Sequence, residues 1–206
     1  MVGPKRNSRM PAYDIDSLEP RARARIIKSA VSPRPIAWIS TTSPDGVDNL
    51  APFSSYNYVS SDEPVVLFNT PYAEGDDQKD TPRNALETEE FAVNVVTEPL
   101  AEAMDTTAAS LDSDESEFDF AEVDRAPCER IDPPRVADAV VTMECTLYDS
   151  MQIRDRLTIF GDVEYVHVDD AVLTDGQIDA AKFDTVGRLG GPYYTVSELL
   201  EFERQF

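Results

Sequence analysis

The sequence predicts a mainly β protein in which antiparallel strands form a closed or partly closed barrel with a few short helices. Three observations predict this fold class. Runs rich in β-branched and aromatic residues recur along the chain, as strands require. Several of these runs are joined by short turn sequences, which is typical of hairpins. The helical patterns are few and short, so a parallel sheet with crossover helices is disfavoured.

The first hairpin is predicted near the N-terminal end of the strand-rich region. The run PIAWISTTS (35–43) predicts a strand, and VDNLAP (47–52) predicts the strand that returns. Between them, PDG (44–46) supplies a glycine that can adopt the positive φ of a turn. Because side chains alternate along a strand, Trp38 is expected in the core or in a dimer interface.

Four further strands are predicted from their apolar and β-branched residues. The run FAVNVV is nearly continuously apolar, which indicates a buried strand. The last two runs are long and are separated by a short turn, so they predict a second hairpin. The four ranges are 65–70, 91–96, 139–153 and 156–170.

Two short helices are predicted from capping signals. Thr81 followed by Pro82 indicates an N-cap and a first-turn proline for a helix from 82 to 90. Thr97 is the expected cap of a second helix from 98 to 108.

Acidic residues dominate the composition. Forty Asp and Glu face 18 Lys and Arg, which gives a net charge of -22. A chain so acidic should repel nucleic acid and anionic membranes. Its carboxylates and its scarcity of lysine are typical of salt-adapted proteins, in which high salt screens the repulsion between acids. We therefore expect a halophilic protein.

The chain is expected to form a basic N-terminal arm, 1–25, which is either flexible or wrapped around another subunit, followed by one domain, 26–206. Between 112 and 124 lie seven acids and no base, which predicts a solvated loop or flap that Phe118 and Phe120 pin to the body. No apolar run is long enough for a membrane span. With no N-terminal apolar region, a cytoplasmic location is expected.

The cysteine and histidine content limits the possible chemistry. Two cysteines cannot form a disulfide framework. Cys145 is expected to be a buried apolar residue, and Cys128 an inert loop thiol. The single histidine, His167, lies in the alternating run VEYVHVDD, where an exposed strand position is expected instead of a metal ligand. No metal site is predicted.

Several catalytic motifs are absent. The cluster GRLGG (187–191) has neither the spacing nor the preceding strand of a dinucleotide-binding fold, and no phosphate-binding loop sequence occurs. The G-x-S-x-G sequence of serine hydrolases is missing as well. The sequence therefore assigns no catalytic side chain.

The segment KDTPRN (79–84) has the features of an anion site. A helix that begins at Thr81 directs free N–H groups and its positive dipole end outward, and Lys79 and Arg83 add charge. The alternative is that Thr81 only caps the helix while the two cations pair with neighbouring acids. A second polar segment, NLAPFSSYN (49–57), can lie against a flat heteroaromatic ring or can pack on one end of the barrel.

Together these stretches resemble the flavin reductase-like family of FMN-binding split barrels, over roughly residues 28–195. The resemblance is carried by residues 32–68, by KDTPRNALETEEFAVNVV (79–96) and by GRLGGPYY (187–194). It implies a Greek-key-like split barrel and a homodimer whose FMN lies at the subunit boundary.

The resemblance also implies which residues hold the cofactor. Those at the isoalloxazine would be Asn49, Ala51, Ser54 and Ser55, and those at the ribityl chain and phosphate would be Lys79, Asp80, Thr81 and Asn84. Arg34, Arg188 and Tyr193 would touch the flavin or close the pocket. For Arg34 the alternative is that it fixes the barrel entrance through carboxylates.

The implied activity is NAD(P)H-dependent flavin reduction, in which NADH or NADPH passes hydride to N5 of FMN and electrons go on to free flavin, a protein partner or another small-molecule acceptor. The cofactor performs the redox step and the protein orients it. Two alternatives remain: an FMN-binding electron carrier or flavin store without NAD(P)H activity, and a barrel without flavin that acts as a dimeric interaction module.

Overall fold

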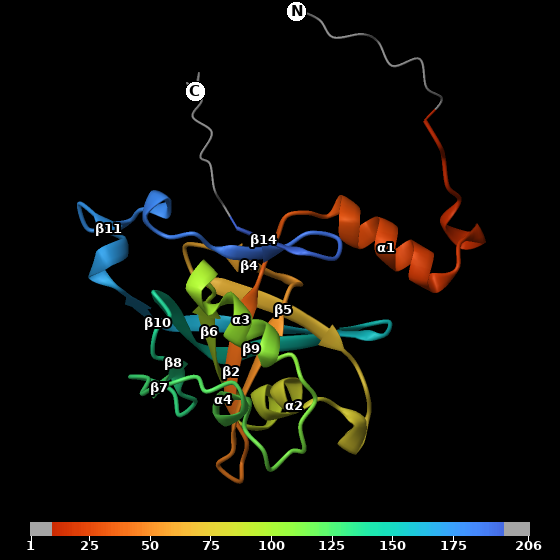
Figure 1. Ribbon diagram of the computed structural model, residues 1–206. Coiled ribbons are helices and arrows are strands. Elements are labelled where there is room, and N and C mark those ends of the chain that lie inside the picture. The colour runs from red at the N-terminus through yellow and green to blue at the C-terminus, as the bar shows by residue number, and fades with distance from the viewer. Residues whose placement is uncertain (1–9, 196–206) are drawn as a thin grey trace, which may run out of the picture.

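A curved antiparallel sheet forms the body of the protein (Figure 1), as the sequence predicts. The structure, a computed structural model, describes residues 10–195. Within that range the largest sheet has seven strands in the order β3-β2-β6-β9-β10-β5-β4. These strands are β2 Ala37–Thr42, β3 Asp48–Phe53, β4 Tyr56–Ser60, β5 Val65–Pro71, β6 Glu90–Val95, β9 Val141–Ile153 and β10 Arg156–Val168.

The two ends of this sheet curl toward each other. Phe53 on the edge strand β3 packs on Phe68 of β5, with ring centroids 4.9 Å apart, although β3 and β5 lie near opposite ends of the strand order. Phe68 in turn meets Phe91 of β6 edge to face at 5.4 Å. This aromatic stack fills the barrel interior and brings the segment after β3 close to β5.

The predicted hairpin at 44–46 is confirmed. Gly46 has a φ of 86°, and the Ser43 amide donates to the Val47 carbonyl at 2.9 Å. Trp38 is fully buried and donates from Nε1 to Thr107 Oγ1 at 2.8 Å, so its predicted core position is confirmed. The prediction of a buried Cys145 is also confirmed, and burial raises the pKa of its thiol.

Small sheets and short helices surround the barrel. A three-stranded sheet orders β1 Arg34–Pro35, β13 Val186–Arg188 and β14 Tyr193–Thr195. Two hairpins pair β7 Arg125–Ala126 with β8 Arg135–Val136, and β11 Leu173–Thr174 with β12 Gln177–Ile178. The α-helices are α1 Pro20–Ala30, α2 Asp80–Glu87, α3 Ala101–Thr106 and α4 Glu117–Phe120. Among the described residues, no helix is long and apolar enough to cross a membrane.

The helix bounds differ from the sequence prediction. The helix expected at 82–90 begins earlier, at Asp80, and ends at Glu87. The range 98–108 divides into a 3-10 turn, Glu98–Leu100, and α3, with no side-chain hydrogen bond from Thr97. Pro99 lies in the first of these turns, where its fixed φ is compatible with a helix and its missing N–H costs nothing.

Several elements were not predicted, among them β4, β14 and α1. The strand β4 arises in a polar, aromatic connection, and β14 follows the glycines near the C-terminal end of the described chain. The helix α1 overlaps the expected arm and extends away from the barrel (Figure 1), with none of its residues buried. Residues 1–9 of the expected arm lie outside the described residues.

Gly161 is required by a close approach inside the barrel. It lies at a register shift in β10, and a Cβ there would overlap the buried Phe91 ring and meet the Cys145 Cβ at 3.0 Å. We expect Gly161→Ala to lower the free energy of unfolding by about 2 kcal/mol, because the packed core must shift. Urea denaturation measures the change. Gly191→Ala, whose Cβ would meet nothing within 4 Å, is the control, and equal effects of both substitutions would contradict the prediction.

Candidate functional site

A cleft of about 280 Å³ opens where β3, the start of α2 and the acidic flap meet. Alternate positions of β3 direct side chains to the same side of the strand. The cleft is lined by Asn49 and residues 51–53 of β3, by residues 79–81 at the start of α2, by the segment 107–111 and by Glu117. Five of the residues predicted to hold a cofactor therefore lie together here: Asn49, Ala51, Lys79, Asp80 and Thr81.

The first turn of α2 faces this cleft without a side-chain cap. Lys79 occupies the N-cap position, and no side chain accepts a hydrogen bond from the turn. The predicted capping role of Thr81 is therefore wrong. The helix begins at Asp80, so Pro82 is its third residue instead of its first, and Thr81 lies inside the helix. Free amides and the positive dipole end of α2 consequently point toward the cleft, as an anion site requires.

The two cations of the KDTPRN segment differ. Arg83 forms an ion pair with Asp80, three residues away. Lys79 is exposed, and no carboxylate lies within ion-pair distance of it among the side chains that the structure describes, which leave out that of Asp76. The alternative in which the cations pair with acids therefore applies to Arg83. The positive charge of Lys79 therefore lies beside the uncapped turn.

A buried polar network holds the base of the cleft. The Thr81 hydroxyl donates to Asn49 Oδ1 at 2.6 Å, and Asn49 Nδ2 donates to a Glu117 carboxylate oxygen at 2.6 Å. The Leu50 amide donates to the same oxygen at 3.0 Å. Thr81 is 3% exposed, so its role is to fix Asn49 and α2 relative to each other.

Asn84 lies beneath the cleft and does not line it. It is 1% exposed, and its amide nitrogen donates to Thr41 Oγ1 at 3.3 Å. Its Oδ1 is buried and has no hydrogen-bond partner in the structure. A buried unpartnered carbonyl is costly, so this oxygen is an acceptor that the described protein atoms leave free.

Sequence reasoning missed Glu117. It belongs to the acidic flap 112–124, and its carboxylate is 6% exposed on α4. Nothing distinguished it from the flap's other acids except its place beside Phe118, which is fully buried. The expected anchoring by Phe120 is wrong, since that ring is 55% exposed. Of the two aromatic residues, Phe118 anchors the flap, and Arg125 stacks over its ring at 4.7 Å.

Arg34 organises the cleft's edge through backbone carbonyls instead of the carboxylates considered from the sequence. Its guanidinium donates to the carbonyls of Lys28, Val31 (2.7 Å), Ser54 (3.0 Å) and Leu189 (3.1 Å). It therefore links the end of α1, the turn after β3 and the loop after β13. Ser54 is half-buried and Ser55 exposed in that turn, directly after the cleft-lining Phe53.

Arg188 and Tyr193 form a separate pair on the small sheet, away from the cleft lining. The Arg188 guanidinium lies 4.1 Å from the centre of the Tyr193 ring. The Tyr193 hydroxyl donates to Asp105 of α3 at 2.6 Å. Burial, and then this hydrogen bond, raises the pKa of Tyr193. Because α3 leads into the segment 107–111, the pair supports one wall of the cleft from outside.

His167 differs from its expected exposed position. Its side chain is 21% exposed, and Nε2 lies 2.5 Å from Glu144 Oε1. Cys128 is half-buried, and burial, followed by the nearby Glu144 charge, raises the pKa of its thiol to about 12. The thiol is therefore neutral at ordinary pH, as predicted for an inert residue.

Comparison with known proteins gives clear matches. The family described as flavin reductase like domain matches residues 29–182. The uncharacterized protein YwrF of Bacillus subtilis is 36% identical over 193 residues, which covers 90% of this chain and 94% of YwrF.

Solved structures are similar over nearly the whole chain. Nitrilotriacetate monooxygenase component B from Bacillus cereus has a TM-score of 0.88 at 29% identity, covering 95% of this chain and 100% of that one. A Shewanella frigidimarina protein described as a flavin reductase with a split barrel domain has a TM-score of 0.78 at 26% identity, covering 92% and 96%. The likeness confirms the predicted split-barrel fold.

Proposed function

Because this chain belongs to the flavin reductase-like family, we propose that it binds FMN in the cleft and catalyses NAD(P)H-dependent flavin reduction. The observation that carries the proposal is the uncapped start of α2, which opens into the cleft beside the exposed Lys79. Helix N-termini with a nearby cation are suited to phosphate. A flavin-related oxidoreductase requires such a binding site for the phosphate of its cofactor.

The residues present fit FMN. Lys79 and the amides of Asp80 and Thr81 would hold the phosphate, since they are the charge and the donors at the helix start. Asn49 and Ala51, with the turn at Ser54 and Ser55, would lie along the ring. Bound FMN would supply a ring that accepts hydride from NADH or NADPH. The chain's own task is then binding, orientation and exclusion of water.

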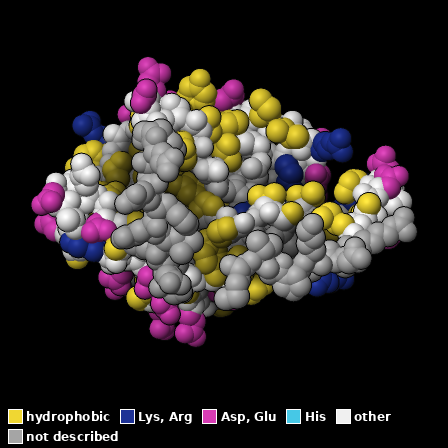
Figure 2. All heavy atoms as spheres, turned by 90° about the horizontal axis from the view of Figure 1, so that it is seen from above, with side chains coloured by type: hydrophobic (Ala, Val, Ile, Leu, Met, Phe, Trp, Pro, Cys, Tyr) yellow, Lys and Arg dark blue, Asp and Glu magenta, His cyan; other side chains and the backbone are white. Residues whose placement is uncertain are grey.

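The cleft in one chain is small for the whole cofactor. Its volume of about 280 Å³ lies just below the range of roughly 300–1,000 Å³ typical of ligand sites. Exposed apolar side chains are also available for association: Tyr58 and Val59 on β4, Tyr148 and Met151 on β9, and Tyr165 on β10. Seen from above (Figure 2), several hydrophobic side chains gather on this face of the molecule. These observations support a homodimer that completes the site.

The test is anaerobic reduction of the purified protein. The bound cofactor is first extracted and identified, and the protein loaded with FMN is then mixed with NADH and, separately, with NADPH in molar salt. We expect the visible flavin absorption to bleach with at least one donor. Bleaching with neither donor would reject the reductase and leave the electron carrier or flavin store. A colourless protein that fails to bind added FMN would reject both flavin functions.

Salt adaptation of a cytoplasmic protein remains a proposal that rests on the net charge of -22. If carboxylate repulsion destabilises the fold at low ionic strength, salt must relieve it. We expect the thermal unfolding midpoint to rise by roughly 5–10 °C between low and molar KCl, about 2–3 kcal/mol for a chain of this size. Calorimetry at several KCl concentrations measures it. A midpoint independent of salt would contradict the proposal.

A further inference from the structure

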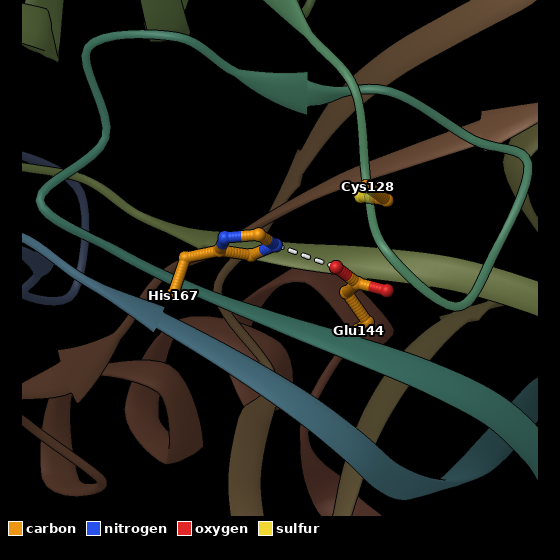
Figure 3. Close-up of side chains that lie close together, drawn as sticks. All are labelled: Cys128, Glu144 and His167. Atoms are coloured by element: carbon orange, nitrogen blue, oxygen red, sulfur yellow. Dashed lines mark hydrogen bonds and ion pairs between the residues drawn. The ribbon is translucent and has the colours of Figure 1, made fainter.

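A second group of polar side chains lies between the β7–β8 loop and the β9–β10 hairpin, outside the cleft described above. Cys128, Glu144 and His167 each offer one ligand atom, and these atoms all lie within 4.8 Å of one another (Figure 3). Cys128 comes from the loop between β7 and β8, Glu144 from β9 and His167 from β10. The two strand residues are diagonal neighbours, because His167 pairs with Thr142 across the hairpin.

The carboxylate at the centre of this group is fixed by the backbone. Glu144 is fully buried, and its two oxygens accept hydrogen bonds from the amides of Glu129 (2.8 Å) and Arg130 (2.7 Å). Those amides belong to the residues that directly follow Cys128. The thiol, the carboxylate and the imidazole are therefore held relative to one another by the same loop and hairpin, as the supported ligands of a metal site are.

The residue types are those that borderline divalent cations select. Zinc binds thiolate sulfur, imidazole nitrogen and carboxylate oxygen, and sites with three protein ligands leave a fourth position for water. The chain has one histidine and two cysteines, and the histidine and one cysteine meet at the same buried carboxylate. A metal site could not be predicted from His167 alone, because the other two ligands are far from it in the sequence.

We propose that Cys128, Glu144 and His167 form a binding site for a divalent cation of the zinc type. The three ligand atoms, which lie within 4.8 Å of one another, would have to approach a common point to reach Zn–S and Zn–N distances of about 2.3 and 2.0–2.1 Å. The hydrogen bond between His167 Nε2 and Glu144 Oε1 breaks, and both atoms coordinate the cation instead. The bound cation links the β7–β8 loop to the β9–β10 hairpin.

The charges of the group set the expected affinity. The Cys128 thiol is neutral without a cation, and a coordinating divalent cation removes its proton, which passes to solvent. Thiolate and carboxylate then balance the two positive charges of the metal. Arg135 lies near the same thiol and adds one competing positive charge. The affinity is therefore expected to be moderate.

The experiment uses the full-length protein under reducing conditions, dialysed against ZnCl₂ or CoCl₂ in molar KCl with excess Mg²⁺. The Mg²⁺ and salt suppress non-specific binding to the acidic surface. We expect one equivalent of Zn²⁺ by elemental analysis, a higher thermal midpoint with Zn²⁺, and sulfur-to-metal charge-transfer absorption with Co²⁺, read as a difference against the metal-free protein.

Variants separate this site from surface carboxylates. Cys128→Ser and His167→Gln are expected to weaken Zn²⁺ binding at least about tenfold, and Cys128→Ser to abolish the sulfur-to-cobalt band. Glu164→Gln is the matched control, because this carboxylate lies on β10 and bonds to Thr146 outside the group. Circular dichroism verifies that each variant folds. Stoichiometric binding that survives in Cys128→Ser and His167→Gln, or no binding in the wild type, would overturn the proposal.

Discussion

Replacing Lys79 with alanine is expected to weaken FMN binding by roughly 10- to 100-fold, because a charge-assisted hydrogen bond to phosphate contributes about 1.5–3 kcal/mol. Lys79 is exposed at the uncapped start of α2, so its removal leaves the fold intact. Fluorescence titration of the flavin-free protein with FMN measures the dissociation constant. The loss should be smaller for riboflavin, which has no phosphate.

Arg83→Ala is the matched control for this prediction. Arg83 belongs to the same segment and carries the same charge, but it is paired with Asp80. We expect it to change the dissociation constant by less than about threefold, since a partly exposed ion pair contributes little. If Lys79→Ala left FMN affinity unchanged, or if both variants weakened it equally, the helix start would not be the phosphate site.

Asn94→Leu is expected to lower the free energy of unfolding by about 4 kcal/mol or more. Asn94 is fully buried on β6, and its amide nitrogen donates to the Trp38 carbonyl at 3.0 Å and to Ser40 Oγ at 3.2 Å. Its Oδ1 accepts from the Val136 amide at 2.9 Å and from Thr142 Oγ1 at 3.0 Å. Leucine would leave all four partners buried without a hydrogen bond, at about 1–3 kcal/mol each before relaxation.

Chemical denaturation of the flavin-free protein measures this loss. Asn57→Leu on β4 is the control, because Asn57 is exposed and its Oδ1 accepts only from the next amide. We expect a change within about 0.5 kcal/mol there. A loss below about 1 kcal/mol at Asn94 would mean that the β8 segment relaxes and finds other partners.

The strand framework could be predicted because its signal is local. The apolar runs at 65–70 and 91–96 correspond to β5 and β6 within about a residue at each end. The strand β4 could not be predicted in this way, because its exposed residues, such as Asn57 and Tyr58, do not form an apolar pattern that indicates burial. Its strand conformation comes from pairing with β5, which is a tertiary effect.

The candidate site was predictable where residue type and spacing carry the chemistry. Lys79 and the amides after it follow from a helix start with a cation beside it. The interaction of Thr81 with Asn49 joins residues 32 positions apart, and the burial of Glu117 depends on how the flap packs through Phe118. Neither is encoded in a local pattern, so both required the folded chain.

The exposed position of α1 has a consequence for how the chain assembles. Helices shorter than about 12–15 residues are marginal in water by themselves, and this one has 11 residues. In the proposed homodimer, contact with the second subunit would stabilise this helix. Amide hydrogen exchange in residues 20–30 should slow as protein concentration rises, while the exchange of β6 stays unchanged, and dilution should unwind this helix before any strand separates.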